Sequence, residues 1–402
     1  MPSFKWEGRN RQGQMVQGEI DAANAAVAVL QLRKQQILPI QVKPEKAKGL
    51  NWKLLLRRKI KEKEVAIFTR QLATMIDAGL PLVQSLEILA SQQENPAFKE
   101  TLLGVKLDVE GGATFSDSLE KKPKVFNELY TNLVTAGEIG GTLDIILNRL
   151  SQYMEKAIAL KKRVKGAMVY PSAILGVSFM VVAVLLIFVI PVFEKMFAGF
   201  GAALPLPTQI VIKMSKFMQG NIVFIIAALI ALGVVLRRYH QTPTGRLLFD
   251  RTLLKLPVFG LLLLKIAVAR FTRTLGTLVS SGVPILDALL ITAKTAGNKI
   301  VENAILKTRV SISEGKTIAE PLGESSVFPP MVVQMIGVGE STGSLDAMLN
   351  KIADFYDEEV DATVSALTSL LEPLMMVFLG VIIGGMMVAM YLPIFQMASV
   401  IG

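Results

Sequence analysis

Apolar residues recur with helical spacing over most of the chain, and one such stretch occurs twice. Residues 68–90 read FTRQLATMIDAGLPLVQSLEILA and residues 271–293 read FTRTLGTLVSSGVPILDALLITA, with ten of the 23 aligned positions identical at a constant offset of 203. In the first copy, Phe68, Leu72 and Met75 share one helical face. The pattern predicts a helical hairpin in each copy, and an internal repeat of this kind determines the whole fold.

A glycine and a proline interrupt both copies at the same place. Gly79 and Gly282 stand where the first helix should end, because glycine adopts the left-handed conformation that follows many helices at little cost. Pro81 and Pro284 come two residues later, in the first turn of the next helix, where a missing N–H costs nothing. We interpret these four residues as structural residues of the repeat.

Three long segments contain no charged residue and no histidine. Each has at least 20 residues, and at a rise of 1.5 Å per residue about 20 helical residues cross a hydrocarbon core of roughly 30 Å. The predicted transmembrane helices are 168–193, 217–236 and 373–397.

The repeat continues through the first and third of these segments. The loop AGEIGGTLD that ends at Asp144 matches VGESTGSLD ending at Asp346, and Pro171 matches Pro373. The repeated unit is therefore a helical domain followed by a membrane helix, and the second span connects the two units. The other predicted regions are a small N-terminal α/β module (1–43), a basic linker (44–63), two helical domains (64–165 and 237–372) and a loop (194–216).

Local sequence patterns predict the structure of the N-terminal module and the character of the linker. Strands are predicted near residues 4–6, 16–20 and 37–42, with a helix over 22–36. The module is short for an independent core. The linker places apolar residues beside lysines and arginines, so it either lies on anionic lipid or is a solvated connection.

Charge orients the chain in the membrane. The sequence holds 43 Lys and Arg against 33 Asp and Glu, a net charge of +10, and 51% of its residues are apolar. Basic clusters flank the first two spans at residues 161–165 and 237–238, which places both helical domains and the N-terminus in the cytoplasm and the loop 194–216 in the periplasm. No segment interleaves aromatic and basic residues as a nucleic-acid surface would.

The residues needed for catalysis are scarce. There is no cysteine, the one histidine (His240) follows a basic flank, and no catalytic constellation stands out. The segment from Gly337 to Ser344 resembles a phosphate loop but has the wrong glycine spacing and lacks the lysine. We therefore predict a protein that is not an enzyme and has no cofactor or metal. The spans hold no ionisable residue, which argues against a small transporter, the remote alternative.

Two glycine-rich loops are the candidate sites for contact with partners. A helix C-cap at Gly137 or Gly339, followed by an N-cap at Thr142 or Ser344, explains most of their sequence. It does not explain a glutamate after each cap glycine, because a helix C-terminus is negative. That glutamate either caps or pairs within the hairpin, or it contacts a partner or an ion. The candidate residues are Gly137, Glu138, Gly140, Gly339, Glu340 and Gly343.

Long, ordered motifs link the chain to a known family. FTRQLATMIDAGLPL, AGEIGGTLD, GESTGSLD, VKGAMVYPSAILG and FVIPVFEKMFAGFGAALPLPT resemble the type II secretion F family, the inner-membrane platform proteins of type II secretion systems and type IV pili. The resemblance covers nearly the whole chain and is closer to the pilus branch. A type II secretion platform is the alternative.

The resemblance implies a fold, partners and a location. It implies two six-helix bundles, a homo-oligomer (dimer or higher), and a multi-pass protein of the bacterial inner membrane. It also implies that cytoplasmic hexameric extension or retraction ATPases act on the protein so that pilin subunits enter or leave the fibre, together with inner-membrane alignment proteins. Some relatives bind a metal at the bundle, but the residue four after Glu138 is Thr142, so that site is not carried over.

Overall fold

The computed structural model describes residues 3–9, 14–22, 25–34, 36–44, 59–198, 204–257 and 259–401. The chain forms two compact units, one comprising residues 1–59 with 93–99 and the other residues 60–92 and 100–402. The basic linker predicted at 44–63 falls mostly outside the described residues.

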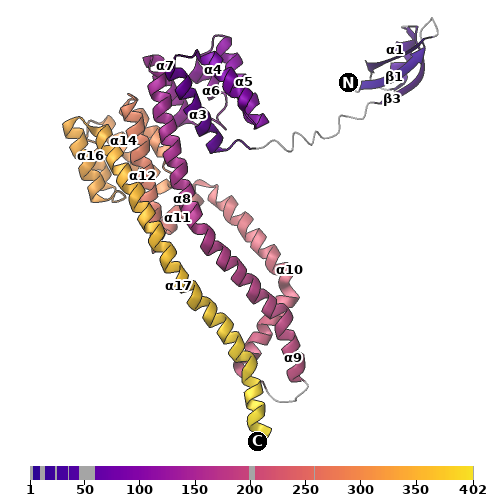
Figure 1. The fold of residues 1–402 in the computed structure, drawn as a ribbon, viewed down its shortest axis with the longest axis vertical. Helices are drawn as coiled ribbons and strands as arrows, with labels where there is room; N and C mark the ends of the chain where they lie inside the picture. Colours follow the sequence, from indigo (N-terminus) through magenta and orange to yellow (C-terminus); the bar gives the residue numbers. More distant parts are fainter. Residues whose placement is uncertain are drawn as a thin grey trace. The chain divides into compact units, whose positions relative to one another are not determined.

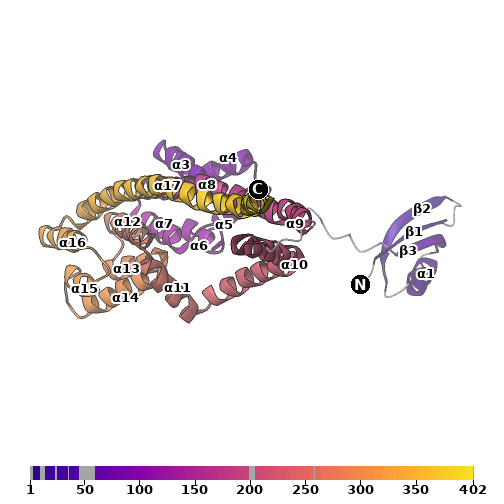
Figure 2. The ribbon, with the colours of Figure 1, turned by 90° about the horizontal axis from the view of Figure 1, so that it is seen from below.

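The N-terminal module is a three-stranded antiparallel sheet with one helix. Strand β1 (Ser3–Arg9) lies between β2 (Met15–Asp21) and β3 (Leu38–Pro44). Helix α1 (Ala25–Lys34) runs along the sheet, and its Ala28 packs with Phe4 in a small core (Figure 2). The predicted α/β module is confirmed.

Each copy of the repeat contributes six helices in the same order. The first copy contributes α3 (Glu62–Asp77), α4 (Leu82–Gln92), α5 (Pro96–Glu110), α6 (Phe115–Glu120), α7 (Glu128–Gly140) and α8 (Leu143–Val184). The second contributes α12 (Phe259–Ser280), α13 (Ile285–Thr295), α14 (Lys299–Ser313), α15 (Ala319–Glu324), α16 (Pro330–Thr342) and α17 (Leu345–Ile401). The predicted class, a duplicated helical membrane protein, is confirmed.

The hairpin glycines have the predicted conformation. Gly79 has φ 81° and Gly282 has φ 78°, both left-handed. The backbone N–H of the following residue donates to a carbonyl five residues back, which satisfies an otherwise unpaired helix end. Pro81 and Pro284 stand immediately before α4 and α13 rather than within their first turns.

Equivalent aromatic pairs lie in the two bundle cores. Phe68 and Phe126 have ring centroids 6.2 Å apart, and the matching Phe271 and Phe328 are 4.8 Å apart. All four side chains are buried. The repeated apolar positions are therefore core positions, as the helical spacing predicts.

Among the described residues, three helices are long and apolar enough to cross a membrane. They are Leu143–Phe197, α10 (Leu206–His240) and Leu345–Phe395. The first joins α8, a π-helical turn and α9 (Ile190–Ala198), and the connection back to the second bundle ends with α11 (Pro243–Lys255). Figure 1 shows α8 and α17 leaving the two bundles in the same direction. The helices also extend into the predicted loop 194–216, because α9 reaches Ala198 and α10 begins at Leu206.

The connector α10 is bonded to both repeated spans at equivalent prolines. Pro191 and Pro393 correspond in the repeat, and each deprives the carbonyl four residues earlier of its helical N–H partner. On α10, Gln219 donates to the carbonyl of Ile187, four residues before Pro191, at 2.8 Å. Thr208 donates to the carbonyl of Ala389, four residues before Pro393. These bonds satisfy backbone groups that lipid could not satisfy.

Candidate partner-contact site

The two glycine-rich turns join α7 to α8 and α16 to α17. The helices end one turn later than expected, because the left-handed C-cap residues are Gly141 (φ 65°) and Gly343 (φ 71°). The prediction of a C-cap at Gly137 or Gly339 is therefore wrong, and both glycines lie inside helices. Gly141, which corresponds to Gly343, was missed because Gly140 beside it satisfies the same sequence pattern.

Gly137 and Gly339 are needed for close packing. A Cβ on Gly137 would lie 2.9 Å from the Ile146 side chain, and one on Gly339 would lie 3.0 Å from the Leu345 backbone. Real Cβ atoms do not approach so closely without a shift of their neighbours. These glycines let α7 and α16 pack directly on the starts of α8 and α17.

The two glutamates cap preceding helices. Glu138 accepts hydrogen bonds from the backbone N–H groups of Phe115 (2.7 Å) and Ser116 (3.0 Å) and from the Ser116 hydroxyl (2.7 Å), at the start of α6. Glu340 accepts from the N–H of Ile318 at 2.9 Å, where α15 begins. A carboxylate is favourable here because a helix N-terminus carries unpaired N–H groups and positive potential.

Because Glu138 is used as a cap, the exposed residue of the first glycine-rich turn is its neighbour Ile139. Ile139 has 83% of its surface exposed, whereas the Glu138 carboxylate is bonded within the bundle. The matching residue in the second turn is Ser341, which is exposed as well. Sequence reasoning missed Ile139, whose exposure follows from the direction in which α7 packs.

The turns lie at the ends of α8 and α17 remote from the uncharged segments. In the first repeat, 23 residues separate Leu143 from Gly166, the first residue of the uncharged run, and this is about 35 Å of helix. In the second, 28 residues separate Leu345 from Pro373, about 42 Å. The candidate loops are thus displaced from the bilayer by the length of the bundles.

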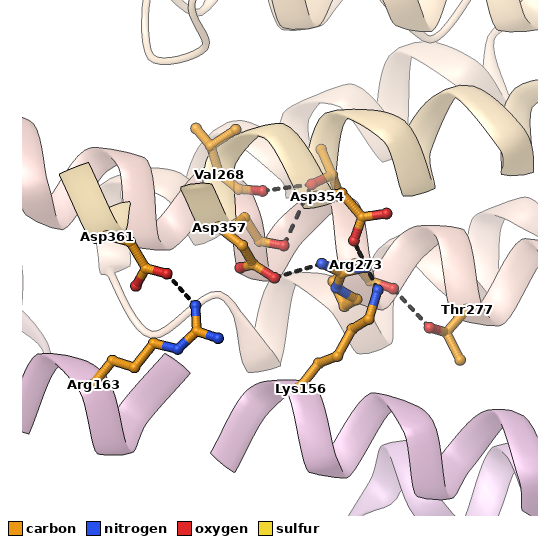
Figure 3. Close-up of polar contacts among 10 residues, drawn as sticks. Lys156, Arg163, Val268, Arg273, Thr277, Asp354, Asp357 and Asp361 are labelled. Carbon is orange, nitrogen blue, oxygen red and sulfur yellow. Dashed lines mark hydrogen bonds and ion pairs between the residues drawn. The ribbon is translucent and has the colours of Figure 1, made fainter. Parts of the chain in front are cut away.

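The second feature is a charged contact between the repeats, drawn in Figure 3. Lys156 on α8 pairs with Asp354 on α17 (2.7 Å), and Arg273 on α12 binds Asp354 (2.9 Å) and Asp357 (2.5 Å). Arg163 on α8 pairs with Asp361. The carboxylates thus join a cation within the second bundle to cations from the first.

These contacts shift the pKa values of Asp354 and Asp357 in opposite directions. Both residues lie outside the uncharged segments. Burial raises the pKa of Asp354, but hydrogen bonds from Lys156 and Arg273 outweigh it, so its pKa is lowered. Burial dominates at Asp357 and raises its pKa despite the adjacent Arg273. Asp354 is therefore the more strongly stabilised anion.

Further contacts extend along the same boundary. The Tyr153 hydroxyl lies 3.2 Å from that of Thr274, and Arg149 donates to the Ser280 carbonyl. Lys294 binds Glu128 at 2.6 Å. Toward the membrane an apolar cluster follows, made of Leu160, Leu262, Val360, Val364 and Leu367.

The described residues contain no group of three or more His, Cys, Asp or Glu side chains placed to hold a metal ion. Their polar chemistry is that of capping and ion pairing. The arrangement can position surfaces and transmit force between packed helices.

Together these features define a multi-pass membrane protein built from a duplicated unit of six-helix bundle and span. The profile of the type II secretion system protein F domain matches it twice, at residues 68–191 and 271–393, and that of the family's N-terminal domain matches residues 1–43. The chain belongs to the type II secretion system protein F family, whose members are inner-membrane proteins.

Individual relatives align over nearly their full length. The type IV pilus assembly protein PilC of Myxococcus xanthus is 51% identical over 99% of this chain and 95% of its own. The protein of the same name from Thermus thermophilus is 44% identical over 98% of each chain. The type II secretion system protein F of Vibrio cholerae is 32% identical over 99% of this chain and 98% of its own.

Proposed function

We propose that this chain is the inner-membrane platform for type IV pilus assembly. The observation that carries the proposal is the 51% identity to a type IV pilus assembly protein over 99% of the chain. The secretion relatives reach 33% at similar coverage. A type II secretion platform is thus the second candidate.

The proposed role is mechanical and not enzymatic. Each bundle continues without interruption into a span through α8 or α17, so a displacement of the bundle reaches the membrane along a single helix. Cytoplasmic extension and retraction ATPases would act on the bundles. Pilin subunits would contact the transmembrane helices. Inner-membrane alignment proteins and further copies of the chain would surround them.

We propose the glycine-rich turns as the contact for the ATPases. They lie about 35 Å of helix from the first uncharged segment, where a cytoplasmic motor can reach them. Gly137, Glu138 and Gly140 shape the first turn and present Ile139, while Gly339, Glu340 and Gly343 shape the second. The glutamates thus support the surface from within, and an exposed Ile139 is the contact residue.

Complementation tests the role. A strain deleted for the gene should lose surface pili and recover them with the wild-type gene. Ile139→Asp should restore membrane-inserted protein but fewer than about one tenth of the pili, while Leu107→Asp, at a residue 65% exposed on α5, should restore both. Normal pili but lost exoprotein export in the deletion strain would favour the secretion role instead.

Cysteine labelling tests the orientation, because the chain contains no cysteine. We place the N-terminus and both bundles in the cytoplasm. A single cysteine at Leu206, which is 74% exposed at the start of α10, should react with an impermeant maleimide on intact spheroplasts. One at Ile139 should react only after lysis. Reaction of both on intact spheroplasts would contradict this topology.

A further inference from the structure

The contact between the two repeats uses one face of α8. The α8 face consists of Arg149, Tyr153, Lys156, Leu160 and Arg163, and each touches α12 or α17 of the second repeat. The surface that receives it includes Ser280, Thr274, Asp354 and Asp361. The two surfaces in this contact are different, because the α8 face packs on α12 and α17 and not on the equivalent face of α17.

Duplication gives α17 a counterpart of the α8 face. At the offset of 202 residues that relates the two glycine-rich turns, the equivalent residues are Lys351, Phe355, Glu358, Ala362 and Ser365. All five are exposed. On a helical wheel they lie about a quarter turn away from the aspartates that bind α8, so the contact between the repeats leaves them uncovered.

The first repeat likewise has a counterpart of the receiving surface. Asp77 corresponds to Ser280, Gln71 to Thr274, and Gln152 to Asp354. Asp77, Gln71 and Gln152 are exposed. A surface pocket of about 310 Å³ hollows this area and is lined by Asp77, Asp144, Ile145, Asn148, Arg149 and Gln152.

The two unoccupied surfaces carry polar groups that can pair. Arg149 binds a backbone carbonyl at Ser280, and the equivalent pair is Lys351 with the carboxylate of Asp77. Lys156 binds Asp354, and at the equivalent place Glu358 would meet the amide of Gln152. In the first pair a neutral acceptor is replaced by an anion, and in the second a cation is replaced by an anion and its partner by a neutral amide. A cation therefore still faces an acceptor, and an anion faces a donor.

We propose that a second copy of this chain binds here, head to tail, with its α17 face on the α3 and α8 surface of the first. Lys351 of the second copy enters the pocket beside Asp77 and Asp144. Because α8 and α17 run in the same direction, both copies keep the same orientation in the membrane. Repetition of an unlike contact with one orientation gives a closed ring or a row.

The contact is confined to the bundles. Toward the membrane, the receiving surface between the repeats has Val364 and Leu367, and the first repeat has Lys162 and Lys165 at those places. The apolar part of the contact is therefore not reproduced, and the interface between copies is weaker than the one within the chain.

Cross-linking of the full-length protein in membranes tests the proposal without reference to pili, so its outcome is separate from that of the pilus role. Two tagged versions, one with Asp77→Cys and one with Lys351→Cys, are expressed together and treated with a short bis-maleimide. We expect a dimer containing both tags, at least fivefold more abundant than with either variant alone. A matched control pairs Asp117→Cys, exposed on α6, with Lys351→Cys, and should give no dimer.

Charge exchange provides the second measurement. Asp77→Lys and Lys351→Asp, each alone, should lower the dimer fraction of the purified protein about fivefold, and the double variant should restore it. Dimers formed by Asp77→Cys alone, or equal cross-linking of the Asp117→Cys control, would overturn the head-to-tail arrangement. Failure of the double variant to restore dimers while all variants stay folded by circular dichroism would overturn the Lys351–Asp77 contact.

Discussion

The same ion pair occurs in both bundles, but in different surroundings. Arg70 binds Glu155 between α3 and α8 at 2.7 Å, and the equivalent Arg273 binds Asp357 between α12 and α17 at 2.5 Å. The Arg70 side chain is 38% exposed and that of Arg273 is 9% exposed, because α8 lies over the second pair. Duplication preserved the bond, and the packing of one copy on the other changed its environment.

A second pair keeps one of its two positions and reverses sign. Glu62 on α3 binds Lys161 on α8 at 2.8 Å, whereas at the position of Glu62 the second bundle has Lys265, which binds Glu359 on α17 at 2.7 Å. Each bundle joins its first and last helices by charge near the membrane side. The partner stands one helical turn earlier in the second bundle, because the residue equivalent to Lys161 is Thr363. The bundles thus share a charged link between these two helices, but not its exact positions or signs.

The largest difference between the bundles should appear when the two arginines are replaced. Arg273→Gln leaves Asp357, whose side chain is 23% exposed, without its cation, whereas Asp354 is 58% exposed and keeps Lys156. We therefore expect a loss of about 2–3 kcal/mol in the free energy of unfolding, mainly from Asp357. Arg70→Gln removes an exposed pair and should cost less than about 1 kcal/mol. Denaturant unfolding of the detergent-solubilised full chain measures both.

Arg273→Lys is the matched control, because it keeps the charge but loses the planar group that reaches two carboxylates. Its loss should lie between that of Arg273→Gln and zero. Equal losses for Arg70→Gln and Arg273→Gln would contradict the view that α8 shields the second pair from water.

The glutamate caps should behave alike, since both carboxylates bind backbone N–H groups at a short helix. Glu138→Ala and Glu340→Ala should each cost about 1–2 kcal/mol of unfolding free energy, the range measured for lost helix caps. Glu138→Gln, which keeps the shape and loses the charge, should cost less. A loss in only one copy would mean that the caps are not equivalent.

Local signals explain what the sequence predicted well. Gly79 and Gly282 determine their turns by their own conformational freedom, and the uncharged runs identify the spans by length alone. Glu138 could not be assigned, because its partners at Phe115 and Ser116 lie 22 to 23 residues earlier and meet it only after α6 and α7 pack.

The contact between the repeats could not be predicted from the sequence for the same reason. Arg163 and Asp361 are 198 residues apart, and each reads in the sequence as a solvated charge beside a membrane helix. Only the packing of α8 on α17 brings them together. The exposure of Ile139 likewise depends on which face of α7 the bundle covers.

The smallest expected effect is the pH dependence that Glu155 contributes in the first bundle. The hydrogen bond from Arg70 lowers the pKa of Glu155 below its ordinary value of 4.5. A lowered carboxyl pKa contributes stability that is fully present above the unfolded-state pKa and is lost as the pH falls through the folded-state pKa. Since Glu155 is 49% exposed, solvent screening limits the contribution to roughly a few tenths of a kcal/mol.

The unfolding free energies of the wild type and Glu155→Gln should therefore differ by a constant small amount from pH 7 to about pH 5 and converge below about pH 4. A difference that grows on acidification would contradict the assigned pairing.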